Sequence, residues 1–426
     1  MSTPELLALP DEPAILADRR RTACDLYEAL PVPRRPRTPL KARRLEAIAY
    51  LEETAPDPSE VPVVLRSAPG SAGHVVLSNG HVVSCRLGAA ASRAGVRLLS
   101  LAEAAQHDAD FVAQHLGSLV APATDRYAAA NAAFWRDGVL LVVPRGVALS
   151  EPITVVHWVG SAAAGVFPRT LILAQDEASA AVVETFMGEP TDTHRVLVSA
   201  TTEVIAGPGS HVSLSALQQL PPGAEAFLRR RGRAHQDARI DWATAEFGAA
   251  LSVAGHHTDL AESGASTTSH TVTFGSGAQH FDYDAEVVHF GAHTTSDMRA
   301  RGVMSGRSRG IFTGLSEIRK GARRADARQK EETLMMSSDA RADAIPSLLI
   351  DDNDVFAAHA ASAGPVDELA LYYLASRGIP RADAVALLVR GFLGPVVERI
   401  ALPAVQDRIW QAIEGKLQEE RGRGGS

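Results

Sequence analysis

Short runs of β-branched and aromatic residues follow one another through the middle of the chain, from about Asn131 to Ile345. Examples are GVLLVV, ITVVHWV, RTLILA, RVLVSATTEVI and HFDYDAEVVHF. Residues of this kind favour strands, and the Gly, Pro, Ser and Asn residues between the runs favour turns. The pattern therefore predicts many consecutive strands with short connections.

So many strands must protect their edges, either in a sandwich or by stacking as a solenoid. A solenoid fits better, because each turn covers the one before it and the chain can lengthen without outgrowing one core. Strand pairs recur at roughly 20–25 residues, within the range of solenoid repeats. We therefore expect a mainly β protein built around a β-solenoid.

The N-terminal part of the chain mixes helix and strand signals. The segment His74–Ser84 has an Asn–Gly dipeptide between two β-rich runs, which predicts a hairpin. The apolar residues of Leu40–Ala55 have near-helical spacing, and Ser100–Leu116 begins with a Ser-x-x-Glu capping box that predicts one helix. We expect an N-terminal α/β region over residues 1–125, followed by the β core over residues 126–345.

Helical patterns return after Pro346. The segment Val366–Gly378 ends at a glycine, and Pro380–Leu402 and Pro403–Glu420 each begin with a proline, which the first turn of a helix tolerates. We expect residues 346–426 to form a helical domain that docks a partner or covers an end of the solenoid.

The charge of the chain argues against nucleic-acid binding. The net charge is −8, and aromatic residues make up 5% of the sequence. There are three basic runs, Arg19–Arg21, Arg34–Arg37 and Arg229–Arg233, each close to prolines, glycines or acids. We expect them to be solvated loops or faces.

Other classes are also disfavoured. No apolar run is long enough for a membrane span, and the first residues lack the pattern of a signal peptide. The two cysteines, Cys24 and Cys85, suggest no disulfide framework, so we expect a cytoplasmic protein. Two thiols are too few to hold an iron–sulfur cluster in this chain alone, and no P-loop motif occurs.

Histidines are frequent in the β region. They are His256, His257, His270, His280, His289 and His293. A metal site requires two to four of them to converge. His280 and His289 could fall on neighbouring strands, while His289 and His293 span a strand end and a turn. We favour exposed or hydrogen-bonded histidines over a metal site.

Three acids in the same region alternate along one strand. Asp282, Asp284 and Glu286 should therefore share a face. A β-helix carbohydrate-active hydrolase would use such a cluster for acid–base work. The alternative, which we favour, is a solvated face paired with arginines such as Arg299 and Arg301.

His359 lies within DDNDVFAAHAAS, residues 351–362, where alanines flank it on both sides. A single histidine in an apolar setting is more often packed or hydrogen-bonded than functional. However, the alanines would pack an inward ring poorly, and they would let another chain approach an outward one.

Residues 345–400 resemble the C-terminal region shared by SufB and SufD, the scaffold proteins of Suf iron–sulfur cluster assembly. The stretches Asn131–Ile153, His256–Tyr283 and His293–Gln329 agree, so the resemblance covers about two-thirds of the chain. The SufD type is favoured, because RQKEETLMMSSDA (328–340) lacks the cysteine of SufB-like proteins, and SufB's acid–His–acid cluster is Ala–His359–Ala here. Many SufD sequences have a cysteine where this chain has Ala357.

The resemblance implies a right-handed parallel β-helix with an N-terminal α/β region and a C-terminal helical domain. It also implies partners, namely a SufB-like paralogue and a SufC-like ATPase, with a homodimer as the alternative when SufB is absent. The chain would then be a scaffold and not an enzyme by itself. Candidates for the contact with SufC are Tyr372, Tyr373, Arg377 and Gly378.

His359 is the candidate residue for cluster assembly under this resemblance. An imidazole can ligate iron or relay a proton near neutral pH. His359 would bind metal only together with ligands from SufB, and the nascent iron–sulfur cluster would be shared with that partner. No cofactor is expected to stay bound to this chain alone, and the residues leave the participation of a flavin open.

Overall fold

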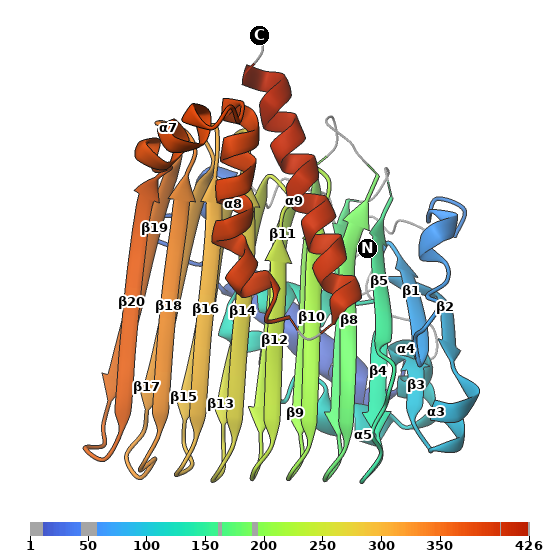
Figure 1. Ribbon diagram of the computed structural model, residues 1–426. Coiled ribbons are helices and arrows are strands. Elements are labelled where there is room, and N and C mark those ends of the chain that lie inside the picture. The colour runs from blue at the N-terminus through green and yellow to red at the C-terminus, as the bar shows by residue number, and fades with distance from the viewer. Residues whose placement is uncertain (1–11, 44–57, 161–163, 190–194, 401, 425–426) are drawn as a thin grey trace.

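The computed structural model describes residues 12–43, 58–160, 164–189, 195–400 and 402–424 (Figure 1). Most of the helix expected at Leu40–Ala55 lies outside these residues, and Leu40–Arg43 form a short 3-10 helix. The rest of the described chain is a parallel β-helix with helices against both sheets, which confirms the solenoid expectation.

Successive strands alternate between two sheets, which we call the front and back sheets. The front sheet, in spatial order, contains β2 (His81–Leu87), β1 (Gly73–Ser78), β5 (Ile153–Val159), β8 (Ser179–Gly188), β10 (His211–Gln219), β12 (Arg239–Glu246), β14 (Ser266–Gly275), β16 (Thr295–Met304), β18 (Asp326–Met335) and β20 (Phe356–Pro365). The back sheet contains β19 (Arg341–Ile350), β17 (Arg309–Ile318), β15 (His280–His289), β13 (Leu251–Leu260), β11 (Ala224–Ala234), β9 (Val196–Ala206), β7 (Arg169–Ala174), β4 (Gly138–Val143) and β3 (Arg97–Ser100), with β6 (Gly165–Val166) beside β9.

Each turn of the β-helix is longer than the strand spacing of the sequence suggests. In the front sheet His211 pairs with Arg239, Arg239 with Ser266, and Thr295 with Asp326, so a turn takes 28, 27 and 31 residues. The expected period of roughly 20–25 residues was too short, because one turn contains two strands of about ten residues plus both corners. This in-register stacking places side chains of one kind above one another along the solenoid.

The two ends of the β-helix differ. At one end the strands β1 and β2 form the predicted hairpin, with Asn79 and Gly80 at φ values of 50° and 84° in its turn. This hairpin and the antiparallel strand β3 complete the sheets there. At the other end, β19 and β20 are the last strands of the back and front sheets, and no described segment pairs with their outer edges.

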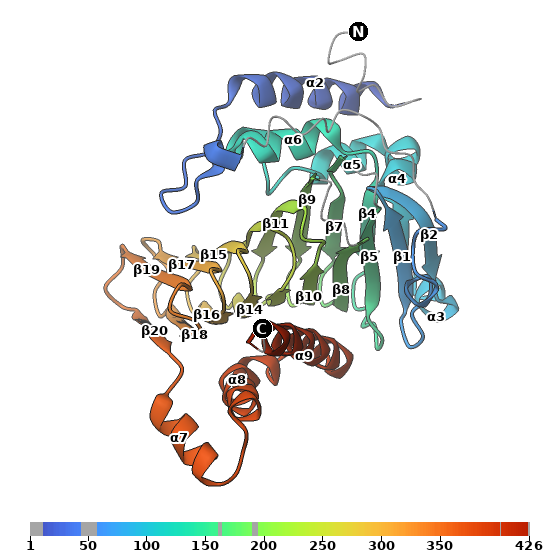
Figure 2. The ribbon, with the colours of Figure 1, turned by 90° about the horizontal axis from the view of Figure 1, so that it is seen from above.

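Helices cover both sheets, as Figure 2 shows. They are α2 (Ala14–Ala29), α3 (Ala89–Arg93), α4 (Leu101–His107), α5 (Ala109–His115), α6 (Arg126–Phe134), α7 (Glu368–Ser376), α8 (Arg381–Val397) and α9 (Pro403–Gly424), with short 3-10 helices at Val63–Leu65 and Pro122–Thr124. The layer of α6 and α2 packs over the back sheet, and α8 and α9 pack over the front sheet.

Two expected boundaries differ from the structure. The helix expected over Ser100–Leu116 is two helices, because Asp108 adopts a non-helical conformation and its side chain caps α5 by accepting from the Phe111 amide. The β core does not end at residue 345, which lies inside β19, but continues to the end of β20. Alanines and serines make β20 a weak strand by composition, and its pairing with β18 decides its conformation.

Candidate functional site

The uncovered end of the β-helix presents two unpaired strand edges to solvent. Most residues of β20 are exposed, and apolar side chains add to this surface: Leu349 is 52%, Ile350 45% and Phe356 54% exposed. An unpaired edge offers backbone N–H and C=O groups to another chain, and β20 has none of the charged side chains that usually protect an edge. This end can therefore bind a further strand or a second β-helix.

His359 lies in β20, directly opposite Gln329 of β18. Paired residues of parallel strands share a face, so His359 lies on the interior face with Gln329, while Ala358 and Ala360 face outward. The sequence placed His359 after the β region; the structure places it on the last strand, at the mouth of the β-helix interior. Ala358 and Ala360 therefore line the outer surface, while Ala357 and Ala361 share the face of the His359 ring.

Two buried acceptors lie beside His359 on the neighbouring strand. Gln329 donates to the Ser316 hydroxyl and the Ser347 carbonyl, but its Oε1 has no hydrogen-bond partner among the described residues. Glu331 is 6% exposed, its Oε2 is also without a partner, and burial raises its pKa to about 7. A proton donor or a cation at this mouth would satisfy both atoms.

The outward side of the same strands forms a basic hollow of about 300 Å³. Its lining includes the charged residues Asp297, Arg299, Arg328 and Lys330 and the residues Gln329, Phe356, Ala358, His359 and Ala360. Arg299 pairs with Asp297 at 3.0 Å, and Arg328 pairs with Asp326. Because alanines leave this room, another chain can approach the backbone of β20 closely from this side.

The candidates for partner docking lie on and just after α7, which has little contact with the rest of the protein. Leu371 is its one buried residue, whereas Tyr372 and Tyr373 are 74% and 57% exposed. Arg377 lies over the Tyr373 ring at 5.3 Å, and Gly378 ends the helix with a φ of +81°. In Figure 2, α7 extends away from the front sheet beyond β20, so the two tyrosines are on a projecting element.

The acids Asp282, Asp284 and Glu286 share a face of β15, as expected, but their partners differ from the expected ones. Arg35 of the N-terminal segment pairs with both aspartates, and Glu286 pairs with His257 at 2.9 Å. The expected arginines, Arg299 and Arg301, lie on β16 of the other sheet. Sequence spacing did not reveal Arg35, because it is about 250 residues away along the chain.

The histidines of the β region do not converge. His280 and His289 begin and end the same strand, β15, so the expectation of neighbouring strands was wrong. His289 accepts or donates hydrogen bonds with Thr294 and Ser296, while His293 lies in the following turn at φ +58°. His256, His257 and His270 lie on β13 and β14. Among the described residues no group of three or more His, Cys, Asp or Glu side chains can hold a metal.

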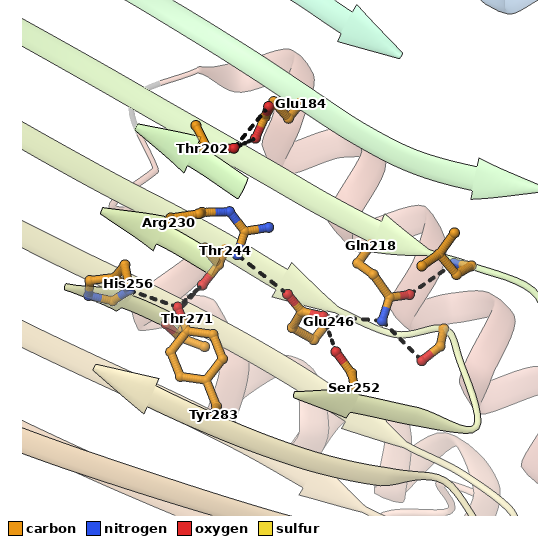
Figure 3. Close-up of polar contacts among 12 residues, drawn as sticks. Glu184, Thr202, Gln218, Arg230, Thr244, Glu246, Ser252, His256, Thr271 and Tyr283 are labelled. Carbon is orange, nitrogen blue, oxygen red and sulfur yellow. Dashed lines mark hydrogen bonds and ion pairs between the residues drawn. The ribbon is translucent and has the colours of Figure 1, made fainter. Parts of the chain in front are cut away.

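A polar cluster fills part of the β-helix interior, where the sequence indicated a solvated basic run (Figure 3). Arg230 is 2% exposed, and its guanidinium lies 3.9 Å from Glu246 without a hydrogen bond to any described residue. Burial lowers the pKa of the neighbouring His256 to about 3, and His256 is hydrogen-bonded to the Tyr283 hydroxyl. Arg20 of another basic run is also buried, where it donates to the Ala133 carbonyl.

Comparisons with known proteins place this architecture in a family. Residues 157–392 match the model described as SUF system FeS cluster assembly, SufBD core domain, and residues 71–155 match the SufBD protein N-terminal region. The chain belongs to the SufBD family. The core match begins in β5 and ends in α8, so it covers the β-helix, His359 and α7.

Individual relatives support the same family assignment. The iron–sulfur cluster assembly protein SufD of Bacillus subtilis is 34% identical over 327 residues, which are 76% of this chain and 74% of that protein. A SufBD family protein of Synechocystis is 28% identical over 72% of this chain and 66% of its own length. SufB of Bacillus subtilis is 26% identical over 70% of this chain and 64% of that protein, so these two matches span just under two thirds of the relatives.

Within the SufBD family this chain is SufD-like, since its identity to SufD exceeds its identity to SufB from the same organism. The resemblance inferred from the sequence is confirmed, and the three acids of the carbohydrate-hydrolase alternative pair with Arg35 and His257. No helix in the described ranges is both long and apolar enough to cross a bilayer.

Proposed function

We propose that this SufD-like protein is a non-catalytic scaffold subunit in iron–sulfur cluster assembly, which pairs with a SufB-type paralogue through the open end of its β-helix. The observation that supports this most directly is the unpaired, alanine-rich edge of β20 beside the exposed side chains Leu349, Ile350 and Phe356. Two such ends can join their sheets edge to edge, so that backbone hydrogen bonds give affinity and apolar side chains are buried. The same end can pair two copies of this chain when the paralogue is absent.

Within this proposal His359 acts at the interface. It lies at the mouth of the interior, next to the partnerless acceptors of Gln329 and Glu331. The nascent cluster is cargo shared with the partner, whose ligands complete the site, and His359 supplies an imidazole that ligates iron or moves a proton. This chain binds no cofactor stably by itself.

We also propose that α7 docks a SufC-type ATPase. Two exposed tyrosines on a projecting helix, with Arg377 stacked on one of them, have the composition typical of a binding hot spot. ATP-driven movement of the docked subunits would then change the contact at the β20 end. The proposal places this assembly in the cytoplasm, where Cys24 and Cys85 stay reduced.

The pairing is tested by co-purification of the full chain with the SufB-type paralogue. Leu349→Lys places a charge on the open end and should abolish co-purification, whereas Ile15→Lys, a matched change at an exposed apolar residue of α2, should leave it intact. Retention of the paralogue by both variants would contradict pairing through this end.

The roles of the two candidate sites are separated by further variants. Tyr372→Ala with Tyr373→Ala should remove the ATPase from the purified complex and leave the paralogue bound. His359→Ala should leave both partners bound but lower the iron and sulfide recovered per complex, while His293→Ala should change neither. An intact complex with normal cluster content in His359→Ala would remove this residue from the proposal.

A further inference from the structure

A large cleft separates α9 from the outer face of the front sheet, far from the β20 end. Figure 1 shows α9 crossing the front of β8, β10 and β12. The cleft has a volume of about 970 Å³, which is at the upper end of the range for small-molecule sites. Nothing in the proposed pairing of β-helices or in the docking through α7 uses it.

Small residues on α9 keep the cleft open. Ala412 and Gly415 are three positions apart on the helix, so they face the cleft together. A side chain placed on Gly415 would have its Cβ more than 4 Å from every neighbouring atom. A glycine inside a helix costs stability relative to alanine, and here no close packing requires it. The absence of a side chain at this position therefore preserves open volume.

The floor of the cleft is largely apolar. It is formed by the outward side chains of β5 and β8 and by the loop after β12, among them Val156, Val183, Met187 and Phe247. Thr185 and Gln219 add polar groups at intervals. An apolar surface with a few polar groups is the usual lining of a site for an organic ligand.

One wall of the cleft has a cation without a counter-ion. Arg408 of α9 is partly buried, burial lowers its pKa, and its guanidinium makes no hydrogen bond or ion pair within the described part of the chain. The other charged residues of the cleft do not pair with Arg408. Lys416 donates hydrogen bonds to Ser276 and Gln279 at 2.9 and 2.8 Å, and Glu419 lies further along α9.

The remaining titratable group in the lining is His74. It is bonded to Thr154 and to the Leu65 carbonyl, and burial lowers its pKa, so it is neutral at physiological pH. The cleft therefore has two cations, Arg408 and Lys416, and one carboxylate, Glu419. The partly buried Arg408 is the cation that lacks a partner among the described residues. A partly desolvated guanidinium gains most from an anionic group that accepts two hydrogen bonds.

We propose that this cleft binds a small organic anion with an apolar body, whose acidic group pairs with Arg408 and whose body lies on Val156, Val183 and Phe247 beneath Gly415. The volume, the apolar floor and the single uncompensated guanidinium together select this class over a neutral or cationic ligand. This inference is independent of the partners of the protein, because it uses surfaces that neither partner contact requires.

The test uses the purified full chain and 8-anilinonaphthalene-1-sulfonate, an aromatic molecule with one anionic group. The wild-type protein should bind it saturably, with a fluorescence increase that fits one site. Arg408→Gln should weaken the binding about tenfold or more, the usual effect of losing a charge-assisted hydrogen bond. Gly415→Leu should weaken binding by placing a side chain in the cleft, and a helix-forming residue there should not impair folding.

Matched controls distinguish the cleft from general dye binding. Gly391→Leu adds the same side chain on α8 where a Cβ also meets no atom within 4 Å, and Arg381→Gln removes an exposed arginine that pairs with Glu368. Both should bind the dye as the wild type does, and all variants should have the circular dichroism spectrum and the melting temperature of the wild-type protein. Absence of saturable binding by the wild type, or equal binding by all variants, would overturn the proposal.

Discussion

Glu331 is expected to make the folded state less stable as the pH rises. Burial raises its pKa from the ordinary value of 4.5 to about 7. Between these values the unfolded chain has lost the proton that the folded chain retains, so unfolding becomes progressively more favourable through this window. The difference between 4.5 and about 7 corresponds to about 3 kcal/mol once the pH exceeds 7.

The variant Glu331→Gln keeps the size of the side chain and removes its titration. Compared with the wild type, this variant should have nearly the same free energy of unfolding at pH 5 and one that is higher by about 2 to 3 kcal/mol at pH 8. Urea unfolding followed by tryptophan fluorescence at both pH values measures the difference.

Glu332, the next residue on β18, provides the control. Burial opposes its ionisation, but hydrogen bonds and charge from Arg301 and Lys330 lower its pKa, so Glu332→Gln should destabilise the protein at pH 8. If the wild type and Glu331→Gln have the same pH dependence from pH 5 to 8, the reasoning about the buried carboxyl at the mouth of the β-helix is refuted.

Three further variants test the interior, the N-terminal segment and a helix boundary. Arg230→Met should lower stability by about 3–5 kcal/mol because it leaves Glu246 buried without its cation, and adding Glu246→Gln should restore part of this loss in calorimetry. Arg35→Gln should speed proteolysis of the segment before Leu40, since it releases two aspartates of β15, whereas Arg34→Gln should not. Asp108→Ala should lower the free energy of unfolding in urea by about 1 kcal/mol, because the cap of α5 is lost. An unchanged free energy would mean that packing alone causes the break between α4 and α5.

Local patterns predicted those elements whose signals lie within a few residues. The Asn79–Gly80 turn has positive φ at both positions, and such a turn directs the chain back on itself whatever lies around it. The capping box at Ser100 predicted the start of α4 for the same reason. The end of that helix was not predicted, because Asp108 acts as the N-cap of α5 only once α5 is packed against the rest of the protein.

The candidate site depended on pairing between distant strands. The sequence singled out His359 and its alanines, but the face on which the ring lies follows from its register with Gln329, which composition does not encode. The orphaned acceptors beside it and the cleft under α9 likewise arise where separate elements meet.

The β-rich runs and turn residues predicted a β-solenoid followed by helices, and the resemblance of several stretches, with the missing cysteine, indicated a SufD-like protein, because these signals are local in the sequence. Which polar residues are buried follows from packing in three dimensions. Arg20 and Arg230 belong to runs that resemble solvated surface, yet packing encloses both. Arg20 donates to the Ala133 and Trp135 carbonyls at the end of α6, and Arg230 lies 3.9 Å from Glu246 of the other sheet, so packing of separate elements supplies these neighbours.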